Sequence, residues 1–319
     1  MGKNIYLSVV VPVYNEEGAV ANLYKEILVT CGKINQPFEI IFVNDGSSDK
    51  TVEVLKSLSP VKIINLRRNF GQTAAMDAGF KAAQGLYIVT LDGDGQNDPA
   101  DIPRLIERLK QDDLDVVSGW RKKRKDSFSK KLSSRCAAMI RKFLIDDGIH
   151  DSGCSLKVYK KECFENVTLY GEMHRFIPAI LKIKGFKIGE LEVNHRSRKT
   201  GSTKYDWKRG MKGILDMFSV WFWKKYANRP LHLFGSLGIV LMVISFLAGA
   251  SAVYQKIFLN RDLSNTSWTD LSMFGFFMGV MFFIFGLLAD ILSKIYFGAT
   301  NDISYDVKEV IEKNTKTND

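Results

Sequence analysis

The chain has 319 residues, a formal net charge of +10, 46% hydrophobic residues and 25% charged residues. This composition excludes an intrinsically disordered chain, because it supplies enough apolar surface for a sizeable core. The four cysteines are scattered without a C-x-x-C pair, and only 4 histidines are present. A disulfide scaffold, a zinc ribbon and a histidine metal cluster are therefore excluded.

Strand-like and helix-like segments alternate through the first part of the chain. Apolar, β-branched runs predict strands at residues 7–13, 38–43, 61–66, 86–91 and 115–118. Helical patterns follow the first three runs, the first ending near Cys31, the second near Leu58, and the third covering residues 73–83. Such alternation is typical of a parallel sheet that is covered on both faces. Ligands bind these sheets at the carboxyl ends of the strands, where this sequence places its polar, glycine-rich segments.

A cluster of oxygen-bearing side chains follows the fourth predicted strand. It reads Asp92-Gly-Asp94-Gly-Gln96, and the segment 44–49 (NDGSSD) follows the second strand at the same expected edge. Two carboxylates and an amide oxygen at this spacing can converge on one hard cation. Mg²⁺ and Mn²⁺ take oxygen ligands and often share them with a substrate's phosphates. An isolated D-x-D is common in turns, but the two segments together predict a Mg²⁺ or Mn²⁺ site.

Two long segments near the C-terminus lack charged residues. Residues 231–254 and 271–289 contain no Asp, Glu, Lys or Arg, and about 20 helical residues cross a hydrocarbon core. A buried core helix is the alternative for either segment. Two such runs in succession favour a pair of transmembrane helices, over residues 231–258 and 271–293.

The residues that flank these helices predict the topology. Residues 211–230 combine large apolar side chains with lysines, a pattern that favours a helix in the membrane interface over an amphipathic core helix. Basic residues just before the first span place the 1–210 domain in the cytosol by the positive-inside rule. Because two spans return the chain to its starting side, the tail at 294–319 is expected there too.

Positive charge is concentrated in two stretches. Residues 121–142 hold ten lysines and arginines against Asp126 alone, and residues 182–229 hold thirteen against four acids. These stretches are either solvated and membrane-facing surfaces or sites that face phosphate groups. Nucleic acid is not an expected partner, since the chain has two predicted spans and no recognised binding module.

Several motifs occur in a fixed order, as VVVPVYNEE, VNDGSSDKT, LRRNFGQTAAMDAGF and LDGDGQNDP. With them the sequence resembles the family 2 glycosyltransferases of the GT-A fold, an α/β fold with a Rossmann-like, mostly parallel sheet. It is most similar to the polyisoprenyl-phosphate glycosyltransferases, the group of dolichol-phosphate mannose synthases and bacterial undecaprenyl-phosphate sugar transferases. The resemblance covers residues 5–295 and implies the inverting, metal-dependent transfer of one sugar from a UDP- or GDP-linked donor to a polyprenyl phosphate. A bacterial inner membrane is the location that it implies.

The resemblance also implies roles for residues that match the family's motifs. Those expected to line the nucleotide pocket, contact the base or ribose, or hold the metal and diphosphate are Pro12, Tyr14, Glu16, Asp45, Asp92, Asp94 and Gln96. The segment 196–205 (RSRKTGSTKY) is similar to a loop that closes over the diphosphates through Arg198 and Lys204. In that loop, Thr203 stands where the family has serine and keeps the hydroxyl.

The acceptor phosphate is expected to contact Arg121, Lys130 and Ser134, which match the family's basic clamp. For the catalytic base, Asp151 matches an aspartate of the eukaryotic relatives, whereas some bacterial relatives have an acid where Cys154 stands. A phosphate monoester has a second pKa of about 6 and is already largely ionised in the cytosol. Asp151 is therefore either a base or a group that orients Arg121 or a lysine. Lys157 stands where many relatives have an arginine, and it lacks that residue's bidentate fork.

Two other functions and one assembly question stay open. A processive polysaccharide synthase is the enzymatic alternative, but its Q-x-x-R-W segment is absent from the sequence. A membrane anchor with a degenerate transferase head is the non-enzymatic alternative. The motif Gly275-x-x-x-Gly279 allows close helix packing. It serves either a homo-oligomer or packing within the chain against Gly235 and Gly238.

Overall fold

The computed structural model describes most of the chain in two compact units, one ending at Val220 and the other beginning at Trp221. The described residues are 5–122, 148–165, 167, 169, 171, 173–196, 218–223, 225–227, 229–260, 262 and 267–299. Residues 211–217 of the predicted interfacial helix and residues 300–319 of the predicted tail lie outside these ranges.

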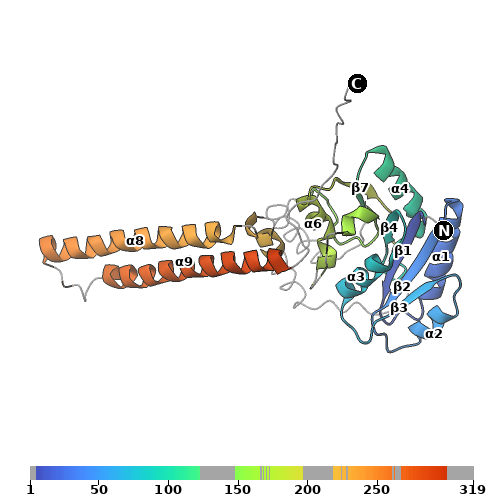
Figure 1. Ribbon diagram of the computed structural model, residues 1–319, viewed down its shortest axis with the longest axis horizontal. Helices are drawn as coiled ribbons and strands as arrows, with labels where there is room; N and C mark the ends of the chain where they lie inside the picture. The colour runs from blue at the N-terminus through green and yellow to red at the C-terminus, as the bar shows by residue number, and fades with distance from the viewer. Residues whose placement is uncertain are drawn as a thin grey trace, which may run out of the picture. The chain divides into compact units, whose positions relative to one another are not determined.

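The first unit contains a seven-stranded sheet with the order β3-β2-β1-β4-β6-β5-β7 (Figure 1). Among the described strands, β6 alone runs antiparallel to its neighbours, β4 and β5. The strands are β1 (Leu7–Val13), β2 (Phe38–Asn44), β3 (Lys62–Asn65), β4 (Tyr87–Thr90), β5 (Val116–Trp120), β6 (Lys157–Lys160) and β7 (Ile188–Glu192). The predicted α/β fold with a mostly parallel sheet is confirmed.

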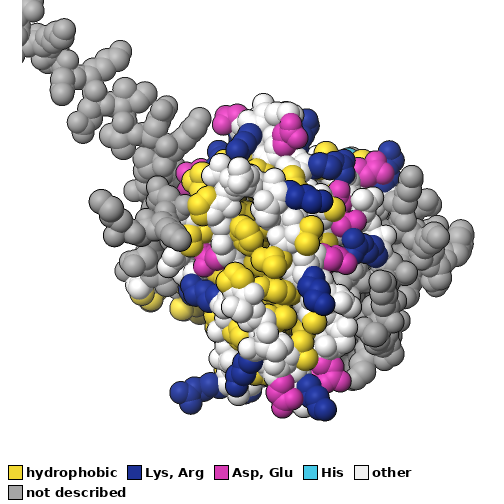
Figure 2. Space-filling model, turned by 90° about the vertical axis from the view of Figure 1, so that its right-hand side faces the viewer, with side chains coloured by type: hydrophobic (Ala, Val, Ile, Leu, Met, Phe, Trp, Pro, Cys, Tyr) yellow, Lys and Arg dark blue, Asp and Glu magenta, His cyan; other side chains and the backbone are white. Residues whose placement is uncertain are grey.

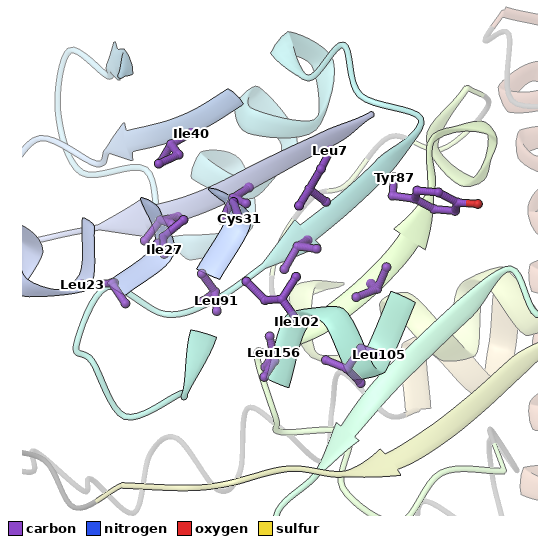
Figure 3. Close-up of a cluster of buried hydrophobic side chains, with 14 of the residues drawn as sticks. Leu7, Leu23, Ile27, Cys31, Ile40, Tyr87, Leu91, Ile102, Leu105 and Leu156 are labelled. Carbon is purple, nitrogen blue, oxygen red and sulfur yellow. The ribbon is translucent and has the colours of Figure 1, made fainter. Parts of the chain in front are cut away.

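Helices cover both faces of the sheet. They are α1 (Val20–Lys33), α2 (Thr51–Lys56), α3 (Gln72–Ala82), α4 (Ile102–Gln111) and α6 (Ile177–Ile183), with short 3₁₀ turns η1 (Pro99–Asp101), η2 (Lys161–Phe164) and η3 (Met173–Arg175). Alternate β1 residues such as Val9 and Val11 pack with α1, α2 and α4, and Val10 packs on the other side with α3 and α6. Figure 3 shows the first of these clusters. Burial on both faces explains why β1 reads as an unbroken apolar run.

The surface of this unit is of mixed character on the face in Figure 2. Hydrophobic and uncharged side chains lie in its centre, and lysine, arginine and acidic side chains are scattered around them. Among the described side chains on this face, both signs of charge are therefore interspersed.

The second unit contains two long apolar helices, α8 (Pro230–Leu259) and α9 (Ser267–Ala299). Each has a mean hydropathy of 2.3 over its most apolar window and is long enough to cross a membrane. They pack side by side as a hairpin (Figure 1). The predicted spans, residues 231–258 and 271–293, lie within these two helices.

Small residues on both helices form the contact between α8 and α9. A Cβ added to Gly238 would lie 2.6 Å from the carbonyl oxygen of Gly279, and one added to Gly279 would lie 2.7 Å from that of Gly238. A Cβ added to Gly286 would lie 3.1 Å from the Gly235 nitrogen, and one added to Gly275 would contact the Ser245 hydroxyl. The G-x-x-x-G motif is thus used within one chain, and self-association through the spans remains a prediction that requires another helix face.

Aromatic side chains gather at one end of this hairpin. Trp223 lies 5.1 Å from Tyr296 and 6.1 Å from Phe297 between ring centroids, and Phe222 lies 6.2 Å from Phe234. Aromatic rings of this kind are enriched at membrane interfaces. The described end of the predicted interfacial segment therefore packs on the hairpin through a cluster of aromatic rings.

The glycine contact gives a first prediction. Gly279→Leu forces α8 and α9 apart and should destabilise the hairpin by roughly 1–3 kcal/mol, as overpacking does. We expect a lower thermal midpoint in mild detergent. Val240→Leu, at a side chain that is 53% exposed, is the matched control and should leave the midpoint unchanged. Equal midpoints for the two variants would contradict the contact.

Candidate active site

The loop after β1 is joined to the loop after β2 by reciprocal hydrogen bonds. Asn15 adopts a left-handed backbone with φ of 56°, and its side-chain oxygen accepts from the Ser48 amide at 2.8 Å. The Glu16 amide donates to the Thr51 hydroxyl at 2.9 Å. These bonds hold the predicted pocket residues Tyr14 and Glu16 at the carboxyl edge of the sheet, where the Tyr14 ring is 47% exposed.

Asp45 follows β2 and is almost completely buried, with 4% of its surface exposed. Its two carboxylate oxygens accept hydrogen bonds from the amides of Phe70 at 2.7 Å and Gly71 at 2.9 Å. The carboxylate therefore fixes the loop that leads into α3. Each oxygen keeps a further lone pair for a ligand, so the expected contact with a base or ribose remains a prediction.

Gly46 allows the loop that leads into α3 to pack against the backbone that follows β2. Its φ is +68°, and a Cβ at this position would lie 2.6 Å from the Asn69 nitrogen, inside backbone contact distance. An L side chain rarely adopts this conformation. The N-D-G sequence is thus required by local packing as well as by any ligand.

The Asp92-Gly-Asp94 turn passes directly over the end of β1. A Cβ at Gly93 would lie 2.6 Å from a Val13 methyl group, so only glycine fits there. The Gln72 side-chain amide, at the start of α3, donates to Asp92 at 2.7 Å. The backbone amide of Gln96 donates to the Asp94 side chain at 3.0 Å. These contacts orient both carboxylates at the edge where Asp45 lies.

The donor set of this turn fits a cation that arrives with a diphosphate. Within the described ranges, no three His, Cys, Asp or Glu side chains are grouped so as to hold a metal by themselves. Mg²⁺ is usually held by one or two carboxylates together with substrate phosphates and water. Asp92 and Asp94, with the Gln96 amide oxygen as a third ligand of suitable chemistry, supply that partial set.

Arg121 follows β5 and forms a close ion pair with Asp151. Arg121 Nε donates to Asp151 Oδ2 at 2.7 Å and Nη2 donates to Oδ1 at 2.9 Å, with the two side chains 13% and 10% exposed. Burial opposes the charge on Arg121, but the hydrogen bonds that Arg121 donates to Asp151, together with the negative charge of that carboxylate, outweigh the effect of burial and raise the pKa of the guanidinium. Asp92 lies within electrostatic reach of the same guanidinium. The second Nη2 proton and both Nη1 protons have no partner among the described residues.

Glu190 holds the backbone that carries Asp151. This β7 carboxylate accepts from the amides of His150 at 2.7 Å and Asp151 at 3.1 Å, and its second oxygen lies 2.8 Å from His150 Nδ1. The His150 ring stacks on Trp120 with centroids 4.7 Å apart. Asp151 is thus fixed by its backbone as well as by its side chain.

A half-buried histidine joins α3 to η3 near the same edge. His174 Nδ1 lies 2.7 Å from the Thr73 hydroxyl, and its Nε2 accepts from Arg175 Nε at 3.4 Å. Burial, and then the charges of Arg175 and Lys157, lower the pKa of His174 to about 3. The imidazole is therefore neutral at physiological pH and acts as a hydrogen-bonding link.

Arg196 anchors the start of the loop that is expected to close over the diphosphates. Its guanidinium contacts Glu26 at 2.6 Å and Asp98 at 2.8 Å, and its amide donates to the Gln96 carbonyl at 2.9 Å. The chain therefore enters residues 197–205 from beside the Asp92 turn. Arg198 and Lys204 lie in that loop, outside the described residues.

The predicted site residues that are described gather at one sheet edge. β1, β2 and β4 deliver Tyr14, Asp45 and Asp92, and β5 delivers Arg121. Pro12 is buried within β1, in register with Val43. The predicted acceptor residues Lys130 and Ser134 lie outside the described ranges.

Several supporting residues are not among the predicted ones. They are Gln72, Thr73, His174, Glu190 and Arg196. Gln72 lies inside the LRRNFGQT motif and Arg196 begins the RSRKTGSTKY segment, so the motifs marked their neighbourhood. Glu190 has no sequence signal, because it reaches Asp151 only through the pairing of β7 with β5.

The chain belongs to glycosyl transferase family 2, whose sequence profile matches residues 8–168. It is 37% identical to dodecaprenyl-phosphate galacturonate synthase of Rhizobium johnstonii over 97% of this chain and 94% of that protein. It is 32% identical to undecaprenyl-phosphate 4-deoxy-4-formamido-L-arabinose transferase of Pectobacterium carotovorum over 98% and 95% of the two chains. The resemblance seen in the sequence motifs is confirmed, and the chain is a glycosyltransferase.

A solved structure has a similar fold. Glucosyl-3-phosphoglycerate synthase of Mycobacterium tuberculosis, in complex with Mn²⁺, UDP-glucose and phosphoglyceric acid, superposes with a TM-score of 0.55. The match covers 69% of this chain and 80% of that chain at 15% identity. At this identity the likeness establishes the shared fold.

Gly46 gives a second prediction. Gly46→Ala should destabilise the first unit by more than about 1 kcal/mol, because alanine opposes the positive φ and its Cβ meets the loop that Asp45 holds. The thermal midpoint and the binding of UDP or GDP with Mn²⁺ should both fall. Gly32→Ala is the control, since a Cβ added to this helical glycine would have no atom within 4 Å, and it should stabilise by about 0.5–1 kcal/mol. A stable Gly46→Ala variant would overturn the packing argument.

Proposed function

We propose that this glycosyltransferase moves one sugar from a nucleotide sugar to a polyprenyl phosphate. The carrying observation is the largely buried Arg121 guanidinium, which Asp151 orients within electrostatic reach of Asp92. An arginine beside a diphosphate site can bind a second phosphate through several charge-assisted hydrogen bonds. Two relatives that match over nearly the whole chain are named for sugar transfer onto dodecaprenyl and undecaprenyl phosphate.

The proposed reaction is a single inverting displacement. An oxygen of the acceptor phosphate attacks the anomeric carbon and forms the new C–O bond. The C–O bond to the nucleotide diphosphate breaks on the opposite face, and its electron pair leaves with the diphosphate. A Mg²⁺ or Mn²⁺ held by Asp92, Asp94 and Gln96 would neutralise the leaving diphosphate, and Arg198 and Lys204 would add positive charge there.

In this proposal, Asp151 orients Arg121 and does not take a proton. The acceptor phosphate has a second pKa of about 6, so its attacking oxygen needs positioning more than deprotonation. The Asp151 carboxylate accepts three hydrogen bonds from Arg121, one of them from the backbone amide. Because both oxygens of the carboxylate are engaged by Arg121, this geometry supports the positioning role over the catalytic-base role.

The donor would bind between the loops after β1, β2 and β4. Tyr14, Asp45 and Glu16 lie on the base side of that edge, and the Asp92 turn lies on the diphosphate side. A thermal-shift panel of UDP- and GDP-sugars with Mn²⁺ identifies the donor, because a ligand that binds only the native state raises the midpoint. Product analysis then distinguishes the three functions. A one-sugar lipid is expected from the proposed transferase, a polymer from a processive synthase, and no product from an inactive membrane anchor.

We place the first unit on the cytosolic face of a bacterial inner membrane. Lys225 and Arg229 precede α8, as the positive-inside rule requires for a cytosolic flank. The acceptor's phosphate would lie at that surface, where the sugar donor is dissolved. A cysteine introduced at the exposed position Val29 should resist an impermeant maleimide in intact cells, whereas labelling there would reverse the topology.

The metal assignment gives a third prediction. Asp94→Asn removes a charged ligand and should abolish both turnover and the stabilisation by UDP or GDP that depends on Mn²⁺. EDTA should inactivate the wild type in the same assay. Asp112→Asn, at the C-terminal end of α4, is the control and should retain both properties. Full activity of the Asp94 variant, or of wild type in EDTA, would refute the assignment.

The acceptor role of Arg121 gives a fourth prediction. Arg121→Ala should weaken the binding of farnesyl phosphate, a short polyprenyl phosphate, by at least about tenfold, because two or more charge-assisted hydrogen bonds are lost. Binding of UDP or GDP with Mn²⁺ should change less than twofold. Arg104→Ala, which removes an exposed arginine that pairs with Asp101, should change neither. If Arg121→Ala weakens the binding of farnesyl phosphate and of the nucleotide by the same factor, Arg121 belongs to the donor site.

A further inference from the structure

A row of three buried polar side chains crosses the sheet next to the candidate active site. Lys157, the first residue of β6, pairs with Thr90 of β4 on one side and with Ser118 of β5 on the other. All three are at most 3% exposed. Because directly paired residues share a face of the sheet, the three side chains lie together, one layer closer to the carboxyl edge than Ile88, Tyr159 and Val116.

The amine of Lys157 turns toward the segment that carries Asp151. It donates hydrogen bonds to the backbone carbonyls of Ser152, at 3.2 Å, and of Cys154. No carboxylate among the described residues lies within ion-pair distance of it. A lysine is almost never fully buried without such a partner. The packing of the sheet alone therefore does not explain why a lysine stands at position 157.

The turn that Lys157 holds is packed tightly against Arg121. A Cβ at Gly153 would lie 3.3 Å from Arg121 Nη2, and one at Gly119 would lie 2.9 Å from the Leu156 carbonyl oxygen. A small displacement of residues 151–154 would therefore move the guanidinium or its Asp151 partner. Glu190 holds the start of this turn by two amides, and Lys157 holds its middle and end by two carbonyls.

We propose that Lys157 is a positioning residue for the acceptor phosphate, acting through the 152–154 carbonyls and Asp151 to fix the Arg121 guanidinium. This inference rests on the proposed role of Arg121 in acceptor binding. It assigns a purpose to the antiparallel direction of β6, which brings the Lys157 amine to the edge where the parallel strands end. Lys157 does not itself touch the acceptor.

The test is a double-mutant cycle with farnesyl phosphate as the binding probe. Lys157→Met should raise the Kd for farnesyl phosphate about tenfold, as expected when hydrogen bonds to a charged group are lost. In an Arg121→Ala background the same change should raise it less than twofold, because residues in one network are not additive. Binding of UDP or GDP with Mn²⁺ should stay within twofold of wild type. Lys157→Arg, which keeps N–H donors, should restore acceptor binding to within about threefold.

One control and one substitute variant separate this role from general destabilisation. Ser118→Ala removes a hydroxyl from the same row that has no hydrogen-bond partner among the described residues, and it should leave the farnesyl phosphate Kd unchanged. If Lys157→Met does not fold, Lys157→Gln replaces it. The glutamine amide keeps an N–H donor on a shorter side chain, so we expect a farnesyl phosphate Kd between that of wild type and the tenfold increase expected for Lys157→Met.

The outcomes distinguish the two proposals. If Arg121→Ala leaves the farnesyl phosphate Kd unchanged, the acceptor role of Arg121 fails. If Arg121→Ala weakens binding but Lys157→Met has no effect, or has its full effect in the Arg121→Ala background, the role of Lys157 fails. An equal loss of nucleotide binding in the Lys157 variants also overturns it.

Discussion

The reversed direction of β6 is the constraint on which the arrangement of the site depends. Parallel strands deliver their carboxyl ends to one edge, so β1, β2, β4 and β5 each bring one polar segment there. An antiparallel strand instead begins at that edge. The segment just before β6 therefore enters between the ends of β4 and β5, which places Asp151 beside Arg121 although the two are 30 positions apart.

The carboxylates at this edge fall into two sets. One set forms hydrogen bonds within the protein, and the other is suited to bind a cation. Asp45, Asp151 and Glu190 each accept hydrogen bonds from amides or a guanidinium of the chain itself. Such contacts orient the loops and the Arg121 guanidinium before any ligand binds. This reduces the entropy that would be lost on ordering these groups when the ligand binds. Asp92 and Asp94, on either side of Gly93, are oriented by Gln72 and by the Gln96 amide and form the pair suited to a metal ion. Preorganisation of this kind is a main source of electrostatic stabilisation in enzymes.

The sequence predicted the central strands better than the supporting contacts. β1 has the predicted bounds because burial on both faces leaves an unbroken apolar run. β6 has four residues with a lysine at each end, which is too short for a periodic pattern. The two roles open to Asp151 could not be separated from sequence, since the choice depends on the direction in which Arg121 points. Glu190 and the fold-back of the Lys157 amine arise only from three-dimensional pairing, and no local motif encodes them.

The lengths of α8 and α9 have a consequence for the lipid environment. With 30 and 33 residues, they are about 45 Å and 50 Å long at 1.5 Å per residue. The charge-free section of α9, residues 271–289, is about 28 Å long by the same rise, close to the thickness of the hydrocarbon core alone. Asp290 and Lys294, which pair at 2.7 Å, mark one end of that section. If the two helices span a bilayer, a thickness that departs from this length would incur a mismatch cost of a fraction of a kcal/mol per Å, so the α9 segment would favour membranes whose acyl chains match it in length.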